Sequence, residues 1–120
     1  MDDIYKKIKT LDELRVIVEK LKSRKKKIVH CHGVFDLIHP GHIRHLMAAK
    51  KEGDVLIVTV TADRFVRKGP GRPIFNEQLR TENLAALGKV DYTAVNHSPT
   101  ATECIKLIKP DIYVKGQDYA

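Results

Sequence analysis

Short apolar runs alternate with longer amphipathic stretches along this chain. A continuous run of β-branched residues is typical of a strand buried on both faces, and apolar residues at helical spacing predict a helix. The pattern predicts strands at residues 28–32, 55–60, 90–95 and 111–114, and helices at residues 11–22, 41–52, 76–87 and 100–108. Strands that alternate with helices predict an α/β fold with a doubly wound parallel sheet and right-handed crossovers.

Local signals place several boundaries of these elements. Residues 10–13 read Thr-Leu-Asp-Glu, which is a capping box for the first helix. Asn76 is predicted to cap the third helix and Gly88 to end it, with Leu79 on the face that we expect to be buried. Residues 64–75 are rich in glycine, proline and basic side chains, so we expect a mobile basic loop without regular structure.

The segments that follow the predicted strands are the natural places for a ligand, because parallel sheets bind ligands at the carboxyl ends of their strands. These segments are residues 33–42, 61–72, 96–100 and 115–118. We expect one domain over residues 1–120, since the chain shows neither an internal repeat nor a second core.

The first of these segments leads from a strand through a tight turn into a helix. The first N–H groups of a helix lack backbone partners and carry partial positive charge, so such a unit favours an anion. Pro40 suits the first helical turn, and Gly41 lets a ligand approach the backbone closely. His39 and His42 flank this turn, where imidazoles can donate hydrogen bonds to phosphate oxygens.

Composition and charge narrow the class of protein. The 120 residues carry a formal net charge of +7, and much of the excess lies in the basic stretch at residues 22–27. We interpret that stretch as a solvated linker, with a patch for a polyanion as the alternative. No apolar run approaches the roughly 20 residues that cross a bilayer. Cys31 and Cys104 do not form a disulfide framework, so we expect a cytoplasmic protein.

A zinc site is a further hypothesis, because His30, His32 and His45 lie near Cys31 in the sequence. In a strand, however, Cys31 faces away from His30 and His32. A structural zinc site needs four convergent ligands. We therefore predict that these residues hold no metal.

The turn belongs to a longer pattern. The chain reads Gly33-x-Phe35-Asp36-x-x-His39-x-Gly41-His42, which resembles the signature of the cytidylyltransferase-like nucleotidyltransferases. Other motifs resemble the heptose-1-phosphate adenylyltransferase domain of ADP-heptose synthases, namely Lys68-Gly69-x-Gly71-Arg72-Pro73, Leu87-x-x-Val90-Asp91, Ile108-x-Pro110-Asp111 and Val114-Lys115-Gly116-x-Asp118-Tyr119. Glycerol-3-phosphate cytidylyltransferases are similar but more distant.

The resemblance implies a Rossmann-like, three-layer α/β/α fold and an enzyme that condenses a nucleoside triphosphate with a sugar phosphate, releasing pyrophosphate. We expect ATP as the nucleotide, Mg²⁺ bound with its phosphates, a homodimer, and neither a nucleic-acid nor a membrane partner. A glycerol-3-phosphate-type cytidylyltransferase that uses CTP is the alternative within this class. A non-catalytic module that binds nucleotides or nucleic acids is the alternative from another class, motivated by the basic stretch.

The resemblance also implies roles for individual residues. The expected catalytic residues are His39, His42 and Lys68, and the expected nucleotide-binding residues are Gly33, Val34, Phe35, Gly41, Lys115, Gly116 and Asp118. Asp63, Arg72 and Arg80 are the expected substrate-binding residues. Two anions remain open for Arg80, the sugar phosphate or an aspartate such as Asp63 or Asp91, and a structural role is favoured for Asp36. A phosphate monoester is already an ionised nucleophile, so no general base is required.

The relatives implied by this resemblance carry a Ser/Thr-rich segment after the last strand, which helps to hold the triphosphate. This sequence ends at Ala120 without it. We therefore expect the N-terminal part of a longer protein, with a sugar-kinase domain as the attached unit, and weak triphosphate binding by residues 1–120 alone.

Overall fold

The computed structural model describes residues 3–67 and 69–116, and within them the strands form one parallel sheet. The strand order is β3-β2-β1-β4. The strands are β1 (Ile28–Gly33), β2 (Val55–Thr61), β3 (Tyr92–Asn96) and β4 (Ile112–Lys115). The order reverses after β3, because the chain crosses back to the free side of β1 to add β4. This arrangement confirms the predicted parallel α/β sheet.

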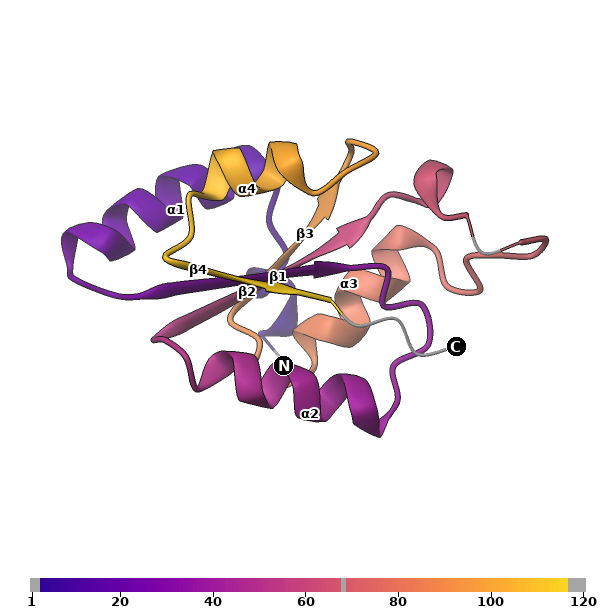
Figure 1. Cartoon of the computed structure of the whole chain (residues 1–120), viewed down its shortest axis with the longest axis horizontal. Coiled ribbons are helices and arrows are strands. Elements are labelled where there is room, and N and C mark those ends of the chain that lie inside the picture. Colours follow the sequence, from indigo (N-terminus) through magenta and orange to yellow (C-terminus); the bar gives the residue numbers. More distant parts are fainter. Residues whose placement is uncertain (1–2, 68, 117–120) are drawn as a thin grey trace.

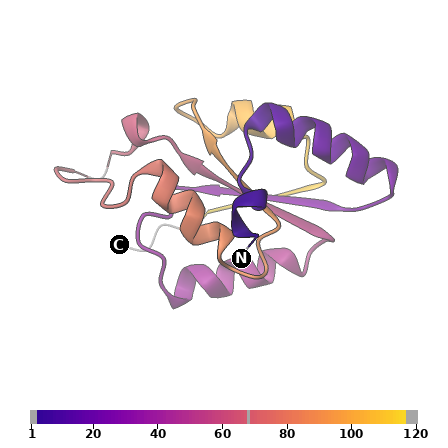
Figure 2. The same cartoon turned by 180° about the vertical axis from the view of Figure 1, so that it is seen from behind.

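Helices cover both faces of the sheet, as Figure 1 and the reverse view in Figure 2 show. On one face lie α1 (Leu11–Ser23) and α4 (Thr102–Ile108), and on the other lie α2 (Pro40–Lys50) and α3 (Glu77–Ala85). Two short 3-10 turns, η1 (Ile4–Lys7) and η2 (Asp63–Phe65), complete the described elements. The molecule is therefore the three-layer α/β/α structure that the sequence predicted.

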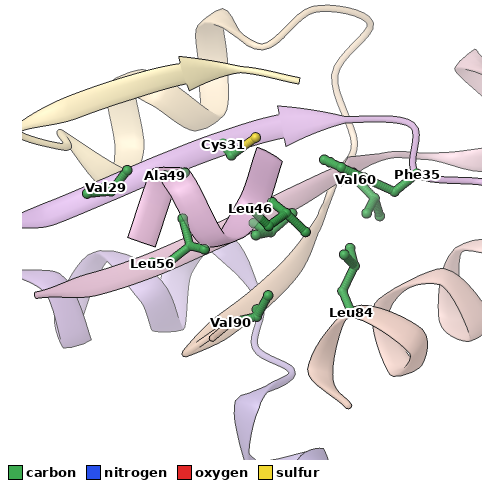
Figure 3. Close-up of a cluster of buried hydrophobic side chains, with 10 residues drawn as sticks. Val29, Cys31, Phe35, Leu46, Ala49, Leu56, Val60, Leu84 and Val90 are labelled. Atoms are coloured by element: carbon green, nitrogen blue, oxygen red, sulfur yellow. The ribbon is translucent and has the colours of Figure 1, made fainter. Parts of the chain in front are cut away.

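Two hydrophobic cores result from this layering. On the α2 and α3 face, Val29, Cys31 and Leu56 pack with Leu46 and Leu84 (Figure 3). The opposite core, beneath α1 and α4, contains Leu14, Val18, Ile28, Val55, Ile57, Ala94 and Ile108. Each fully buried large aliphatic side chain contributes about 1.5–3 kcal/mol relative to its exposed state. β2 supplies side chains to both cores, which explains its uninterrupted apolar run.

The register brings the carboxyl ends of the strands to the same edge of the sheet. Gly33 pairs with Val60, Thr61 with Asn96, and His32 with Lys115. The segments that follow the strands consequently gather at the edge on the right of Figure 1. The basic stretch at residues 22–27 precedes β1, so it lies at the opposite end of the sheet.

Several predicted boundaries were wrong by a few residues. The capping box at Thr10 and the Asn76 cap are confirmed. However, α3 ends at Ala85, β3 begins only at Tyr92, and η2 is a helical turn that reaches into the segment expected to lack regular structure. Leu79 is exposed, contrary to prediction, because Arg80, Thr81, Leu84 and Ala85 form the buried face of α3.

Thr93 provides a test of polar burial in the sheet. Its hydroxyl is buried and has no hydrogen-bond partner among the described residues. Thr93→Val should therefore raise the free energy of unfolding by about 1 kcal/mol, measured by denaturant titration. Thr59→Val is the matched comparison, since the Thr59 hydroxyl lies within hydrogen-bond distance of His30 and His32, and it should be destabilising. A lower stability for Thr93→Val would contradict this assignment of its hydroxyl.

Candidate active site

The helix start after β1 is built from two imidazoles. His39 is the N-cap of α2, with extended backbone angles (φ −130°, ψ 174°), and Pro40 follows at the first helical position. Nδ1 of His39 accepts a hydrogen bond from the Gly41 N–H at 2.9 Å, and Nδ1 of His42 accepts one from the His39 N–H at 3.2 Å. This reciprocal arrangement is a capping box in which histidines replace the usual hydroxyl and carboxylate.

The capping bonds determine which ring nitrogen carries the proton. An imidazole whose Nδ1 accepts a hydrogen bond is, in its neutral form, protonated on Nε2. His39 and His42 therefore both carry an Nε2–H donor, and their ring centroids lie 4.2 Å apart. Two imidazole donors beside the first N–H groups of a helix suit the oxygens of a phosphate chain.

Phe35 holds the turn in a strained conformation. Its φ of +51° lies in the left-handed region, where a bulky residue is rare. The buried ring packs edge-on against His42 at a centroid distance of 5.7 Å. It also covers Gly33, where an added Cβ would lie 2.9 Å from the Phe35 ring. Backbone strain of this kind persists only where the surroundings enforce it, and it concentrates at functional sites.

Asp36 ties the long loop after β2 to this turn. Its buried carboxylate accepts hydrogen bonds from the N–H groups of Ile74 at 2.8 Å and Phe75 at 2.9 Å, and from Arg72 at 3.2 Å. Burial alone would raise the pKa of Asp36, but the two backbone bonds and the guanidinium outweigh burial and lower it. The structural role favoured for Asp36 is thus confirmed, and Arg72 is held beside the His39 turn.

Arg80 is fully buried and joins three segments of the site. Its Nη2 atom donates to Asp63 Oδ1 at 2.7 Å, Nη1 to the Val34 carbonyl at 2.9 Å, and Nε to the Phe75 carbonyl at 3.0 Å. Of the two anions left open for Arg80, the structure forms the ion pair with Asp63. The guanidinium thereby positions the residues of the turn and the loop.

The carboxyl end of β4 lies directly against the same turn. The Gly116 N–H donates to the His32 carbonyl at 2.9 Å. A Cβ at Gly116 would lie 2.2 Å from that oxygen, so only glycine fits there. The Lys115 carbonyl accepts a hydrogen bond from His45 Nε2 at 3.0 Å, which fastens β4 to α2. Gly33, Lys115 and Gly116 are therefore brought together as expected.

Two expected site residues, Lys68 and Asp118, lie outside the described residues. Those that the structure describes gather at the carboxyl edge of the sheet, on the turn (Gly33, Val34, Phe35, His39, Gly41, His42), at the end of β2 and in the loop after it (Asp63, Arg72), on α3 (Arg80) and at the end of β4 (Lys115, Gly116).

An open depression of about 480 Å³ borders this site at the ends of β2 and β3. It is lined by Ala62, Asp63, Arg64, Asn76, Glu77, Gln78 and His97. Glu77 is fixed there because its carboxylate accepts the Asp63 N–H at 2.9 Å. Glu77 and His97 were not among the predicted site residues. Both follow an asparagine that ends or begins an element, Asn76 before α3 and Asn96 at the end of β3, and this position is what could have indicated them.

His30 and His32 lie on the sheet face opposite Cys31, as the alternation along β1 predicted. Cys31 belongs to the core beneath α2, whereas both histidines contact Thr59, with His30 Nε2 at 2.8 Å and His32 Nδ1 at 2.7 Å. Burial lowers the pKa of His30 to about 3 and that of His32 to about 4. Both imidazoles are consequently neutral at pH 7. Thr59 was missed, although it is a polar residue inside an otherwise apolar run.

The fold and this edge together are those of a nucleotidyltransferase domain. The chain belongs to the cytidylyltransferase-like family, which matches residues 30–120. It is similar to the bifunctional protein HldE of Aliarcobacter butzleri, with 46% identity over 114 residues that cover 93% of this chain and 24% of that protein. The HldE protein of Campylobacter jejuni subsp. jejuni is 46% identical over 119 residues, covering 98% of this chain and 25% of that protein.

A solved structure agrees with this assignment. The lipopolysaccharide core biosynthesis protein from Thermoplasma volcanium GSS1 superposes with a TM-score of 0.68 and 36% identity, covering 73% of this chain and 72% of that chain. The chain spans about a quarter of the length of its HldE relatives. In the part of the chain that the structure describes, no helix is long and apolar enough to cross a membrane.

The buried histidines of β1 predict a pH-dependent stability. Their pKa values are lower in the folded chain than the ordinary 6.5, so the unfolded chain binds more protons between about pH 6.5 and pH 4, and stability falls as the pH falls through that window. The free energy of unfolding should drop by about 2 kcal/mol per histidine between pH 7 and pH 5, measured by urea titration. His32→Phe should reduce this dependence; an equal stability at both pH values would contradict it.

Proposed function

We propose that this chain transfers the adenylyl group of ATP to a sugar 1-phosphate, giving an ADP-sugar and pyrophosphate, in an enzyme of the ADP-heptose synthase type. The observation that carries the proposal is the imidazole capping box of His39 and His42 at the carboxyl edge of the sheet. The similarity to HldE proteins and to a lipopolysaccharide core biosynthesis protein supports a sugar phosphate as the acceptor.

The reaction follows from charge and position. A phosphate oxygen of the sugar phosphate attacks the α-phosphorus and forms the new P–O bond, while the bond from the α-phosphorus to the bridging oxygen breaks and pyrophosphate leaves. The nucleophile is already ionised, so positioning and charge stabilisation dominate. The Nε2–H groups of His39 and His42 donate to the α- and β-phosphate oxygens, where negative charge increases during the transfer.

The acceptor is proposed to occupy the depression at the ends of β2 and β3. Carboxylate and amide groups from Asp63, Glu77 and Asn76 line it and suit sugar hydroxyls, and Arg64 adds positive charge. Arg72, ion-paired to Asp36 at the edge of the turn, is placed to contact the acceptor phosphate or the triphosphate. Lys68 is proposed to add charge from the same loop, and Asp118 to contact the nucleotide beyond β4.

Mg²⁺ is proposed to bind with the triphosphate. This ion retains several waters and uses one or two carboxylates together with substrate phosphates. Asp63 fits that requirement, because its side chain is 39% exposed and stands at the end of β2, even though one oxygen pairs with Arg80. Bound there, Mg²⁺ would neutralise part of the charge on the triphosphate.

The wider assembly is also a proposal. The chain matches about a quarter of relatives that are named bifunctional, which supports a second catalytic domain, such as a sugar kinase, in the full protein. Ile43 and Met47 are exposed one turn apart on α2 and support a homodimer. Both cysteines are free and buried, which agrees with a cytoplasmic setting. The position of residues 22–27, at the far end of the sheet, favours the enzyme over the nucleic-acid module.

The capping box allows catalysis and folding to be separated at one position. His39→Asn retains a good N-cap but removes the Nε2–H donor, so pyrophosphate release in the full protein should fall about a hundredfold while the stability stays close to that of the parent. His39→Ala should show the same loss of rate together with about 1 kcal/mol lower stability. His42→Ala tests the second donor in the same assay, with thermal unfolding recorded in parallel.

The substrates are distinguished in that assay by pairing ATP or CTP with a sugar 1-phosphate or with glycerol 3-phosphate. Turnover restricted to CTP and glycerol 3-phosphate would establish the cytidylyltransferase alternative. Near-normal rates in both His39→Ala and His42→Ala would refute the assigned roles. Tight, steeply salt-dependent binding to oligonucleotides without turnover would favour the nucleic-acid module.

A further inference from the structure

A chain of hydrogen bonds connects the sheet interior to the carboxyl edge through side chains that the proposed transfer does not use. His30 Nε2 lies 2.8 Å from Thr59 Oγ1, and His32 Nδ1 lies 2.7 Å from the same oxygen. His32 Nε2 lies 3.4 Å from the hydroxyl of Thr61. His30 and Thr59 are completely buried, whereas His32 and Thr61 are half-buried at the ends of β1 and β2.

The direction of these bonds follows from the number of protons. The Thr59 hydroxyl has one proton and three neighbours within hydrogen-bond distance, His30 Nε2, His32 Nδ1 and, at 3.7 Å, Cys104 Sγ. Sulfur is a weak acceptor, and the two imidazole nitrogens lie much closer, so the hydroxyl donates to one imidazole and accepts from the other. Were it to donate to His30 Nε2, the proton of His30 would lie on Nδ1, which is buried and has no partner among the described residues. A buried N–H without a partner is rare and unfavourable. His30 therefore donates from Nε2 to Thr59, and Thr59 donates to Nδ1 of His32.

This direction makes His32 a neutral donor at the edge of the site. With Nδ1 accepting from Thr59, its proton is on Nε2, and burial lowers its pKa to about 4, so the ring carries no charge at pH 7. The 3.4 Å separation from Thr61 is longer than an ordinary N–H···O bond. A ligand oxygen can therefore form a better hydrogen bond with this N–H than Thr61 does.

We propose that His32 Nε2–H and the Thr61 hydroxyl form a recognition site for an uncharged hydroxyl group, carried either by the acceptor sugar or by the ribose of the nucleotide. A hydroxyl both donates and accepts, which matches an imidazole N–H beside a threonine hydroxyl. The phosphates are instead assigned to His39, His42 and Arg72 by the proposed function. The identity of the two ligands rests on the proposed function. The pairing of an N–H donor with a hydroxyl at this site does not depend on it.

The first test removes the residue and the ligand hydroxyl separately and together. In the full protein, kcat/KM is measured for the parent, His32→Phe and Thr61→Val with ATP, 2′-deoxy-ATP and 3′-deoxy-ATP, and with sugar 1-phosphates that each lack one hydroxyl. One deoxy compound should lower kcat/KM about tenfold in the parent, mostly through KM, and by much less in His32→Phe. The compound that shows this coupling identifies the sugar or the ribose. Equal losses in parent and variants for every compound would overturn the proposal.

The second test does not depend on turnover. Nitrogen-15 NMR of the histidine side chains at pH 7 should show His30 and His32 protonated on Nε2. Thr59→Val should alter the His32 signals. Thr93→Val removes a buried threonine hydroxyl that has no partner among the described residues, and it should leave the His32 signals unchanged. Addition of ATP or of a sugar 1-phosphate should shift the His32 Nε2–H signal.

The two tests separate the failure of the site from the failure of the proposed function. Absence of turnover with every substrate pair, together with a shift of the His32 signal by one ligand, would refute the transfer reaction and retain the hydroxyl site. Ligand-induced shifts at His39 and His42 with an unchanged His32 signal would refute the hydroxyl site and retain the phosphate site. A His32 ring protonated on Nδ1 in the unliganded protein would also overturn the inference.

Discussion

The geometry of the site depends on one buried guanidinium. Arg80 has no exposed surface, yet its hydrogen bonds reach Val34 in the turn after β1, Asp63 after β2 and Phe75 in the long loop. A buried charge is tolerated only when it is paired and hydrogen-bonded, so these partners must stay in place around it. Asp36 also fixes the loop to the turn, because its carboxylate accepts hydrogen bonds from backbone N–H groups of the loop. The turn and the loop are therefore held in one relative position.

The histidines of this chain perform two different tasks because their surroundings differ. His39 and His42 use Nδ1 to cap a helix, so in its neutral form each ring carries its proton on Nε2. His30 and His32 lie in a strand beneath α4, where burial keeps them neutral and Thr59 joins them. Two imidazoles that cap a helix and two that are buried in a strand thus lie only a few residues apart in the sequence.

Much of this organisation was determined by the sequence itself. Apolar runs and helical periodicity predicted the parallel sheet and its covering helices. A strand that is buried on both faces has apolar residues at successive positions, instead of alternating apolar and polar ones. The helix start after β1 was also predicted, since the strand, the tight turn and Pro40 are local features of one short segment. The capping box at Thr10 was predicted from neighbouring residues and is confirmed.

Only the tertiary structure determined which residues far apart in the sequence form ion pairs and hydrogen bonds with one another. Periodicity allowed two faces of α3 to be buried, and the ion pair of Arg80 with Asp63 selected the face that left Leu79 exposed. The link from His30 through Thr59 to His32 arises from the register between β1 and β2, which the residues of neither strand encode alone. Local structure follows from interactions between near neighbours in the sequence, whereas these contacts exist only after the sheet has brought separate segments together.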